Sequence, residues 1–219
     1  MLPRELRTEV YRVLSETFKE PAPEFAGILN SGELFRFLTD SFRKLGLNFD
    51  FGGIEGCRSL HFQELKRLYW DAFAGPVASK VTPVESVYRR WSEDPASDSP
   101  IAKLKGYLMS DRALHMQELY RQAGLSFPPE VAATPDHLAL ELEFMALLSE
   151  KANFETQAEF CTDHLDWLDD LAVDAVEKGI PAFYRVMIEA TAALVRRDAE
   201  MLANAEMRGG AGGGAARGL

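Results

Sequence analysis

The acidic and imidazole side chains at the start of one apolar helix are the first residues whose types could do chemistry. The segment TPDHLALELEFMALL, residues 134–148, is apolar at helical spacing but begins with Pro135, Asp136 and His137. Capping by Thr134 accounts for Pro135 and Asp136, because a helix start accepts proline at its first position and favours a carboxylate in its first turn. Capping does not account for His137, since an imidazole gains nothing from the positive end of a helix.

A metal site is one chemistry that this pattern allows. Asp136, His137 and Glu141 would converge if His137 and Glu141 pair one helical turn apart. A metal site in a helical bundle takes more ligands, such as Glu-x-x-His from two helices, and that spacing is absent around the other histidines, which are His61, His115 and His164. The sequence therefore predicts no metal and no other cofactor.

A second polar group lies in VTPVESVYRRW, residues 81–91. Pro83 fixes the backbone of a loop, after which Glu85, Ser86 and Tyr88 present a carboxylate, a hydroxyl and a phenol. Two interpretations stay open, namely a capped short helix with Tyr88 half-buried and a polar lining for a groove between helices. Neither an activated nucleophile nor a phosphate-binding loop is indicated, because Gly-x-Ser-x-Gly and Gly-Lys-Ser/Thr are both missing.

The elements that must position these groups are all expected to be helices. Apolar residues recur at helical spacing and no stretch alternates as a strand does. The expected helices cover about 6–18, 34–45, 60–73, one or two segments between Ser99-Pro100 and Gly124, 135–152, 156–177 and 181–205. His164 and Trp167 of HLDW lie on an apolar face and are expected in the core. We predict one all-α domain over 1–207 and a disordered, glycine-rich tail over 208–219.

Charge and composition exclude some functions. The chain has 219 residues and a formal net charge of −10, which argues against nucleic acid as a partner and fits a basic partner. The stretch from Glu155 to Glu177 contains acidic residues but no Lys or Arg. It forms either a solvated helix face or a surface that attracts a basic partner. No apolar run suffices for a membrane span, and Cys57 and Cys161 form no CxxC pair. We therefore expect a cytoplasmic protein without direct membrane insertion.

Three motifs, in this order, resemble those of the TorD-like family of redox-enzyme maturation chaperones, which includes the DmsD proteins. TPVESVY at 82–88 follows FAGP at 73–76 and is similar to the family's proline-containing loop ending in Ser-Val-Tyr. PDHLALELEFMALL at 135–148 resembles its Pro-Asp-His helix start, and FCTDHLDWL at 160–168 resembles its His-Leu-x-x-Trp helix. Some members carry Trp-Gly where this chain has Val84-Glu85.

The resemblance implies an all-helical cytoplasmic chaperone that does no covalent chemistry. Its expected partner is the apo catalytic subunit of a molybdenum or tungsten oxidoreductase, bound through its twin-arginine signal peptide before cofactor insertion and export. The family also includes domain-swapped forms, so a homodimer is possible. By motif position the peptide groove would contain Pro83, Glu85, Ser86, Tyr88, Pro135, Asp136, His137 and Glu141. The alternative function is a helical enzyme or electron-transfer protein that binds a metal or haem.

Overall fold

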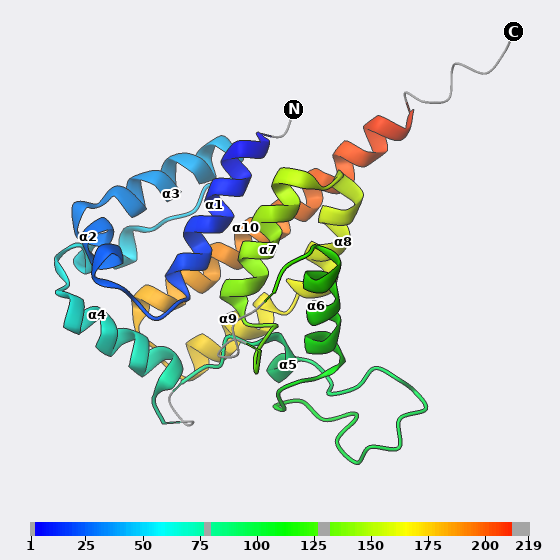
Figure 1. Ribbon diagram of the computed structural model, residues 1–219. Helices are drawn as coiled ribbons and strands as arrows, with labels where there is room; N and C mark the ends of the chain where they lie inside the picture. The colour runs from blue at the N-terminus through cyan, green and yellow to red at the C-terminus, as the bar shows by residue number, and fades with distance from the viewer. Residues whose placement is uncertain (1–2, 77–79, 127–131, 212–219) are drawn as a thin grey trace, which may run out of the picture.

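The computed structural model describes residues 3–76, 80–126 and 132–211, and within these ranges it consists of helices and loops (Figure 1). The helices are α1 (Arg4–Thr17), α2 (Pro23–Ser31), α3 (Glu33–Lys44), α4 (Phe62–Tyr69), α5 (Glu85–Tyr88), α6 (Asp111–Gln122), α7 (Leu138–Lys151), α8 (Phe154–His164), α9 (Leu168–Glu177) and α10 (Ala182–Ala211). A 3₁₀ segment (Gly52–Ser59) precedes α4 and a π-helical turn (Trp70–Ala74) follows it. The all-α prediction is confirmed.

The core lies where α1 and α7 run side by side with α10 behind them (Figure 1). Apolar side chains from the three helices are fully buried there, including Val10, Leu14, Leu142, Met145, Met187 and Ile188. The Ser15 hydroxyl of α1 donates a 2.8 Å hydrogen bond to the Ala139 carbonyl of α7. This bond fixes α1 against the first turn of α7, the turn that carries the Pro-Asp-His segment.

A buried ion pair joins the first and last helices. Nε and Nη2 of Arg7 donate to the two carboxylate oxygens of Asp198 at 2.6 and 2.7 Å, and neither side chain is exposed. The Tyr11 hydroxyl donates to Asp198 Oδ2 at 2.9 Å. Bidentate geometry of this kind is among the strongest that an arginine can make with a carboxylate.

Several expected elements differ from the observed ones. The helix expected over 156–177 is two helices, because the chain turns between His164 and Leu168. Ser99-Pro100 does not start a helix; α6 begins at Asp111, with the Ser110 hydroxyl accepting from the Arg112 amide at 3.2 Å. The expected helices also omitted α2, which begins at Pro23.

The C-terminal helix is longer than expected. α10 continues through Ala211, beyond the predicted end at about 205. Residues 212–219 lie outside the described residues, so the tail predicted over 208–219 stays a prediction, as does the single domain over 1–207. Among the residues that the structure describes, no helix combines the length and apolar character needed to cross a membrane.

Candidate functional site

The first helical turn after Thr134 is capped by the histidine itself. α7 begins at Leu138, and Nδ1 of His137 accepts a 3.2 Å hydrogen bond from the Ala139 amide. Burial lowers the pKa of the His137 imidazole to about 4, so the ring is neutral at neutral pH and can accept this bond. The sequence-based assignment of Thr134 as the cap is therefore wrong. A neutral imidazole does gain from a helix start, because it satisfies a backbone donor there.

Backbone hydrogen bonds join the two polar segments of the sequence. Val84 and His137 form an isolated antiparallel bridge. The Leu138 amide donates to the Pro83 carbonyl at 2.9 Å, and the Glu85 amide donates to the Asp136 carbonyl at 3.0 Å. The start of α5 is thus held directly against the start of α7.

The Asp136 carboxylate ties these segments to a third one. Asp136 is fully buried, and its Oδ2 accepts from the Ser86 amide at 2.7 Å and from the Ser86 hydroxyl. The Ser110 hydroxyl, which precedes α6, bonds the Ser86 hydroxyl at 2.9 Å. Pro135 is buried beside Asp136, and its carbonyl accepts a 3.0 Å hydrogen bond from the Tyr120 hydroxyl of α6.

Two buried glutamates lie deeper in the same cluster. Nδ1 of His164 is 2.8 Å from Oε2 of Glu85, and Nε2 of His164 is 2.8 Å from Nδ1 of His115. Oε2 of Glu141 accepts a 3.1 Å hydrogen bond from the Trp167 indole. His164 and Trp167 lie in the core, as predicted.

Burial dominates the titration of this cluster. Burial raises the pKa of Glu85 to about 8 and raises the pKa of Glu141 well above its usual range. It lowers the pKa of His164 to about 4. The contact between Glu85 and His164 is therefore a hydrogen bond at neutral pH rather than an ion pair.

The structure brings the eight predicted site residues together, but mostly inside the protein. The side chains of Glu85, Ser86, Asp136 and Glu141 are fully buried, and Pro83 and Pro135 are buried as well. Tyr88 is 8% exposed; its hydroxyl donates to Asp174 of α9 at 2.9 Å, and its ring stacks on Trp167. Their contact with a peptide stays a prediction. The sequence reasoning did not assign Ser110 or His115 to this site, and no local pattern marks either residue.

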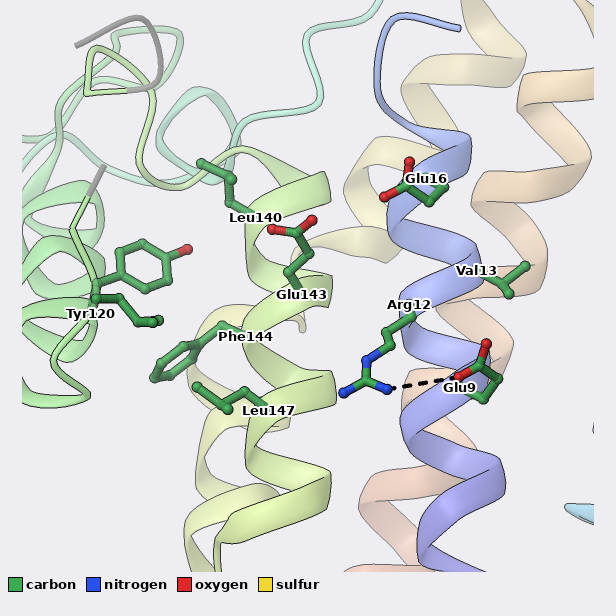
Figure 2. A pocket seen from close by; sticks show the side chains of 10 residues that line it. Glu9, Arg12, Val13, Glu16, Tyr120, Leu140, Glu143, Phe144 and Leu147 are labelled. Atoms are coloured by element: carbon green, nitrogen blue, oxygen red, sulfur yellow. Dashed lines mark ion pairs between the residues drawn. The ribbon is translucent and has the colours of Figure 1, made fainter. Parts of the chain in front are cut away.

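A groove opens beside this cluster, between α1, α6 and α7. Its volume is about 490 Å³, and apolar and acidic side chains line it: Val13, Tyr120, Leu125, Leu140, Phe144, Leu147, Glu9, Glu16 and Glu143, with Arg12. Figure 2 shows Arg12 and Glu143 between α1 and α7, and Phe144 turned toward Tyr120. Lys19 binds both Glu16, at 2.6 Å, and Glu143. The groove offers an apolar floor with carboxylates along its rim.

The acidic stretch of the sequence forms an exposed surface on α8 and α9. Glu155, Glu159, Asp163, Asp166, Asp169, Asp170 and Glu177 are exposed, and Asp174 is half-buried. Some of these carboxylates are paired with Arg89, Arg196, Lys105 or Lys178. Val173 and Val176 stand among them with 58% and 55% exposure, so this surface is both acidic and apolar.

The fold, the order of the motifs and the family comparison all indicate the same class of protein. An all-helical chain whose Pro-Asp-His helix start is joined to a Thr-Pro-Val-Glu-Ser-Val-Tyr loop has the features of a redox-enzyme maturation chaperone. Residues 41–173, more than half of the chain, match the family described as the nitrate reductase delta subunit. The chain therefore belongs to this TorD-like family.

One curated protein and one solved structure are similar to this chain. The chaperone protein TorD of Shewanella piezotolerans is 26% identical over 141 residues, which is 64% of this chain and 62% of that protein. The chain thus spans about three fifths of the length of this curated relative. A putative redox enzyme maturation protein from Archaeoglobus fulgidus aligns with a TM-score of 0.47 and 18% identity, over 92% of this chain and 94% of the other.

Proposed function

We propose that this protein binds the catalytic subunit of a molybdenum or tungsten oxidoreductase in the cytoplasm, before its cofactor is inserted. It holds the twin-arginine signal peptide of that subunit and releases the subunit for export once it is mature. It does no covalent chemistry of its own. Membership in a family of maturation chaperones supports the class of function, and the groove between α1 and α7 supports the kind of ligand.

The composition of this groove is the observation that carries the proposal. A twin-arginine segment combines guanidinium groups with the apolar residues that follow them. The groove combines carboxylates of Glu9, Glu16 and Glu143 with apolar side chains beneath them. A guanidinium binds a carboxylate in bidentate fashion, and an apolar segment gains free energy when it leaves water.

The carboxylates at the rim of the groove can exchange their present ion-pair partners for the arginines of a peptide. Lys19, which binds Glu16 and Glu143, is 37% exposed, and the pairs of Arg12 with Glu9 and Glu150 are more exposed. Exposed ion pairs contribute only about 0–1 kcal/mol, so a peptide arginine can replace Lys19 at little cost.

The eight sequence-predicted residues enter this proposal chiefly as support. Asp136 and Ser86 fix the start of α7, and α7 supplies Leu140, Glu143 and Leu147 to the groove. Glu141 is next to Leu140 in sequence but is fully buried, whereas half-buried His137 lies three residues before Leu140. Direct contact between the peptide and Glu85 or Glu141 would require the cluster to open.

Calorimetric titration with the signal peptide of a molybdenum reductase from the same genome tests the proposal. The intact peptide is compared with one in which both arginines are alanine, and the protein variants are Glu143→Gln and Leu147→Asn. We expect the arginine substitutions to abolish measurable binding and each variant to weaken it about tenfold, as a lost charge-assisted bond or apolar contact predicts. Glu200→Gln, an exposed change on α10 outside the groove, is the matched control.

The possible results distinguish an error in the proposed chaperone function from an error in the proposed peptide-binding groove. Tight binding that is unchanged in both groove variants would keep the chaperone function and reject this groove. If the peptide does not bind and the chain does not capture the apo subunit, the proposed function is wrong. Sedimentation of the free and bound chain would show whether it forms the homodimer that the resemblance allows.

A further inference from the structure

Three side chains from different helices meet in the buried cluster. Glu85 of α5, Glu141 of α7 and His164 of α8 each offer one ligand atom, and these atoms all lie within 4.8 Å of one another. All three side chains are buried, so the atoms converge in a region without bulk water. This set differs from the Asp136, His137 and Glu141 group considered from the sequence. His137 Nδ1 and Asp136 Oδ2 are already used by the Ala139 amide and by Ser86.

Two buried carboxylate oxygens of this cluster lack a hydrogen bond in the described part of the chain. Among the described residues, Glu85 Oε1 and Glu141 Oε1 are buried and accept no hydrogen bond. The second oxygen of each group is engaged, Glu85 Oε2 by His164 and Glu141 Oε2 by Trp167. A buried carboxylate oxygen without a donor is costly, and a bound cation is one way to satisfy it.

The nearby arginines do not donate hydrogen bonds to these two carboxylate oxygens. The closest cation is Arg89, whose Nε is 3.9 Å from Glu85 Oε1, beyond hydrogen-bond distance, while its Nη2 binds Asp166. Arg112 is engaged by Glu93 at 2.7 Å and by the Asp163 carbonyl at 3.1 Å. Neither arginine forms a hydrogen bond with Glu141, and the side chains of Glu85 and Glu141 hydrogen-bond each other, where a bound cation would replace the shared proton.

His115 is placed to orient the imidazole of His164 toward a metal. When Nδ1 of His164 is a ligand, its Nε2 carries the proton and donates to Nδ1 of His115, 2.8 Å away. Metal-bound histidines characteristically donate their other N–H to such an acceptor, which fixes the ring. A cavity of about 510 Å³, lined by His115, Asp163, His164 and Glu159 among others, leads to His164 from the surface of α6 and α8.

We propose that Glu85, Glu141 and His164 form a binding site for one divalent transition-metal ion. Two carboxylates and one imidazole suit a borderline ion such as Zn²⁺ or a hard one such as Mn²⁺ better than a soft ion. The bound ion links α5, α7 and α8, the helices that hold the Pro-Asp-His segment and the Tyr88 loop in place. This inference stands apart from the proposed binding of a signal peptide and does not depend on it.

The test is metal titration of the full chain, purified without a polyhistidine tag and first stripped with a chelator. Zn²⁺, Mn²⁺ and Co²⁺ are titrated by calorimetry, and Co²⁺ is followed by visible absorption. We expect one equivalent to bind and to raise the melting temperature. Glu141→Gln keeps the shape of the side chain and an acceptor for Trp167, and it should abolish this binding. Glu143→Gln, an exposed change on the same helix, and His61→Gln, at an exposed histidine, are the controls and should bind as the wild type does.

A second variant keeps the inference testable if Glu141→Gln does not fold. His115 is exposed at the surface cavity, so His115→Gln is tolerated better, and loss of the orienting contact should weaken binding about 10–100-fold. Absence of one-equivalent binding by the wild type would overturn the metal site. Equal affinity in His115→Gln, or equal loss in Glu143→Gln and Glu141→Gln, would overturn it as well.

Discussion

The carboxylate of Asp136 holds three chain segments at one point. It accepts the Ser86 amide and hydroxyl, and Ser86 in turn contacts Ser110. Replacing Asp136 with alanine leaves buried donors of Ser86 without an acceptor. We therefore expect Asp136→Ala to lower the free energy of unfolding by about 3 kcal/mol, measured by urea denaturation.

The control for this change is an exposed aspartate. Among the described residues Asp40 pairs with Arg43 alone, three residues further along the same helix, and its side chain is 63% exposed. Asp40→Ala should alter the free energy of unfolding by less than about 0.5 kcal/mol. An equally small effect of Asp136→Ala would show that the buried contacts are replaced by others.

The imidazole of His137 should make stability depend on pH. Its pKa falls from the usual value of 6.5 to about 4 in the folded chain because it is buried. Between these two values the unfolded chain binds more protons, so the contribution of His137 is fully present above pH 6.5 and is lost as the pH falls toward 4. The loss is at most about 3 kcal/mol, at ~1.4 kcal/mol for each pH unit.

Comparison with His137→Asn isolates this contribution, because asparagine can also accept the Ala139 amide at the helix start but does not titrate. Urea denaturation of both proteins between about pH 4 and 7 should show the wild type losing stability relative to the variant as the pH falls. A constant difference across this range would mean that His137 titrates normally in the folded chain.

Single residues show what the sequence could and could not predict about the site. The motif resemblance selected Ser86 and Asp136, and the structure brings them into contact across 50 positions. Their residue types indicated polar chemistry but not the burial that turns them toward each other. Burial depends on the packing of α5, α6 and α7 around them, and no local pattern encodes that packing.

At the scale of helices, the pair of Arg7 and Asp198 fixes α1 to α10. Removing one partner leaves the other charge buried and unpaired, so we expect Asp198→Asn to cost about 3–5 kcal/mol in urea denaturation. Replacing both, as Arg7→Met with Asp198→Leu, should recover much of this loss because no unpaired charge remains. If the double variant is as unstable as the sum of the single changes, the two side chains do not act as a pair.

Helix boundaries follow the sequence where local rules decide them. Apolar spacing predicted α1, α3 and α10, and Gly46, with a φ of 75°, ends the α3 turn as expected. The break between α8 and α9 was not predicted, because distant contacts support it. The Trp167 indole donates to the His164 carbonyl and to Glu141 of α7, which favours a turn where local periodicity continues.

At the scale of the whole molecule, the negative charge is unevenly distributed. The net charge is −10, and the exposed carboxylates of α8 and α9 account for a large part of it. The three glutamates of the groove add further negative charge. Such a surface attracts a cationic segment over distances longer than a hydrogen bond, and salt weakens that attraction over a Debye length of about 10 Å at 0.1 M.

The proposed peptide should therefore associate at a rate that depends on salt. We expect the association rate constant, measured by stopped-flow fluorescence of a labelled signal peptide, to fall several-fold between about 0.05 and 0.5 M NaCl, while the dissociation rate changes little. Changing the exposed Glu155 and Glu159 to glutamine removes charge away from the groove, so it should slow association and reduce its dependence on salt without altering dissociation. If instead the association rate is flat across this range, the acidic face of α8 and α9 is only a solvated surface, and recognition depends on short-range contacts in the groove alone.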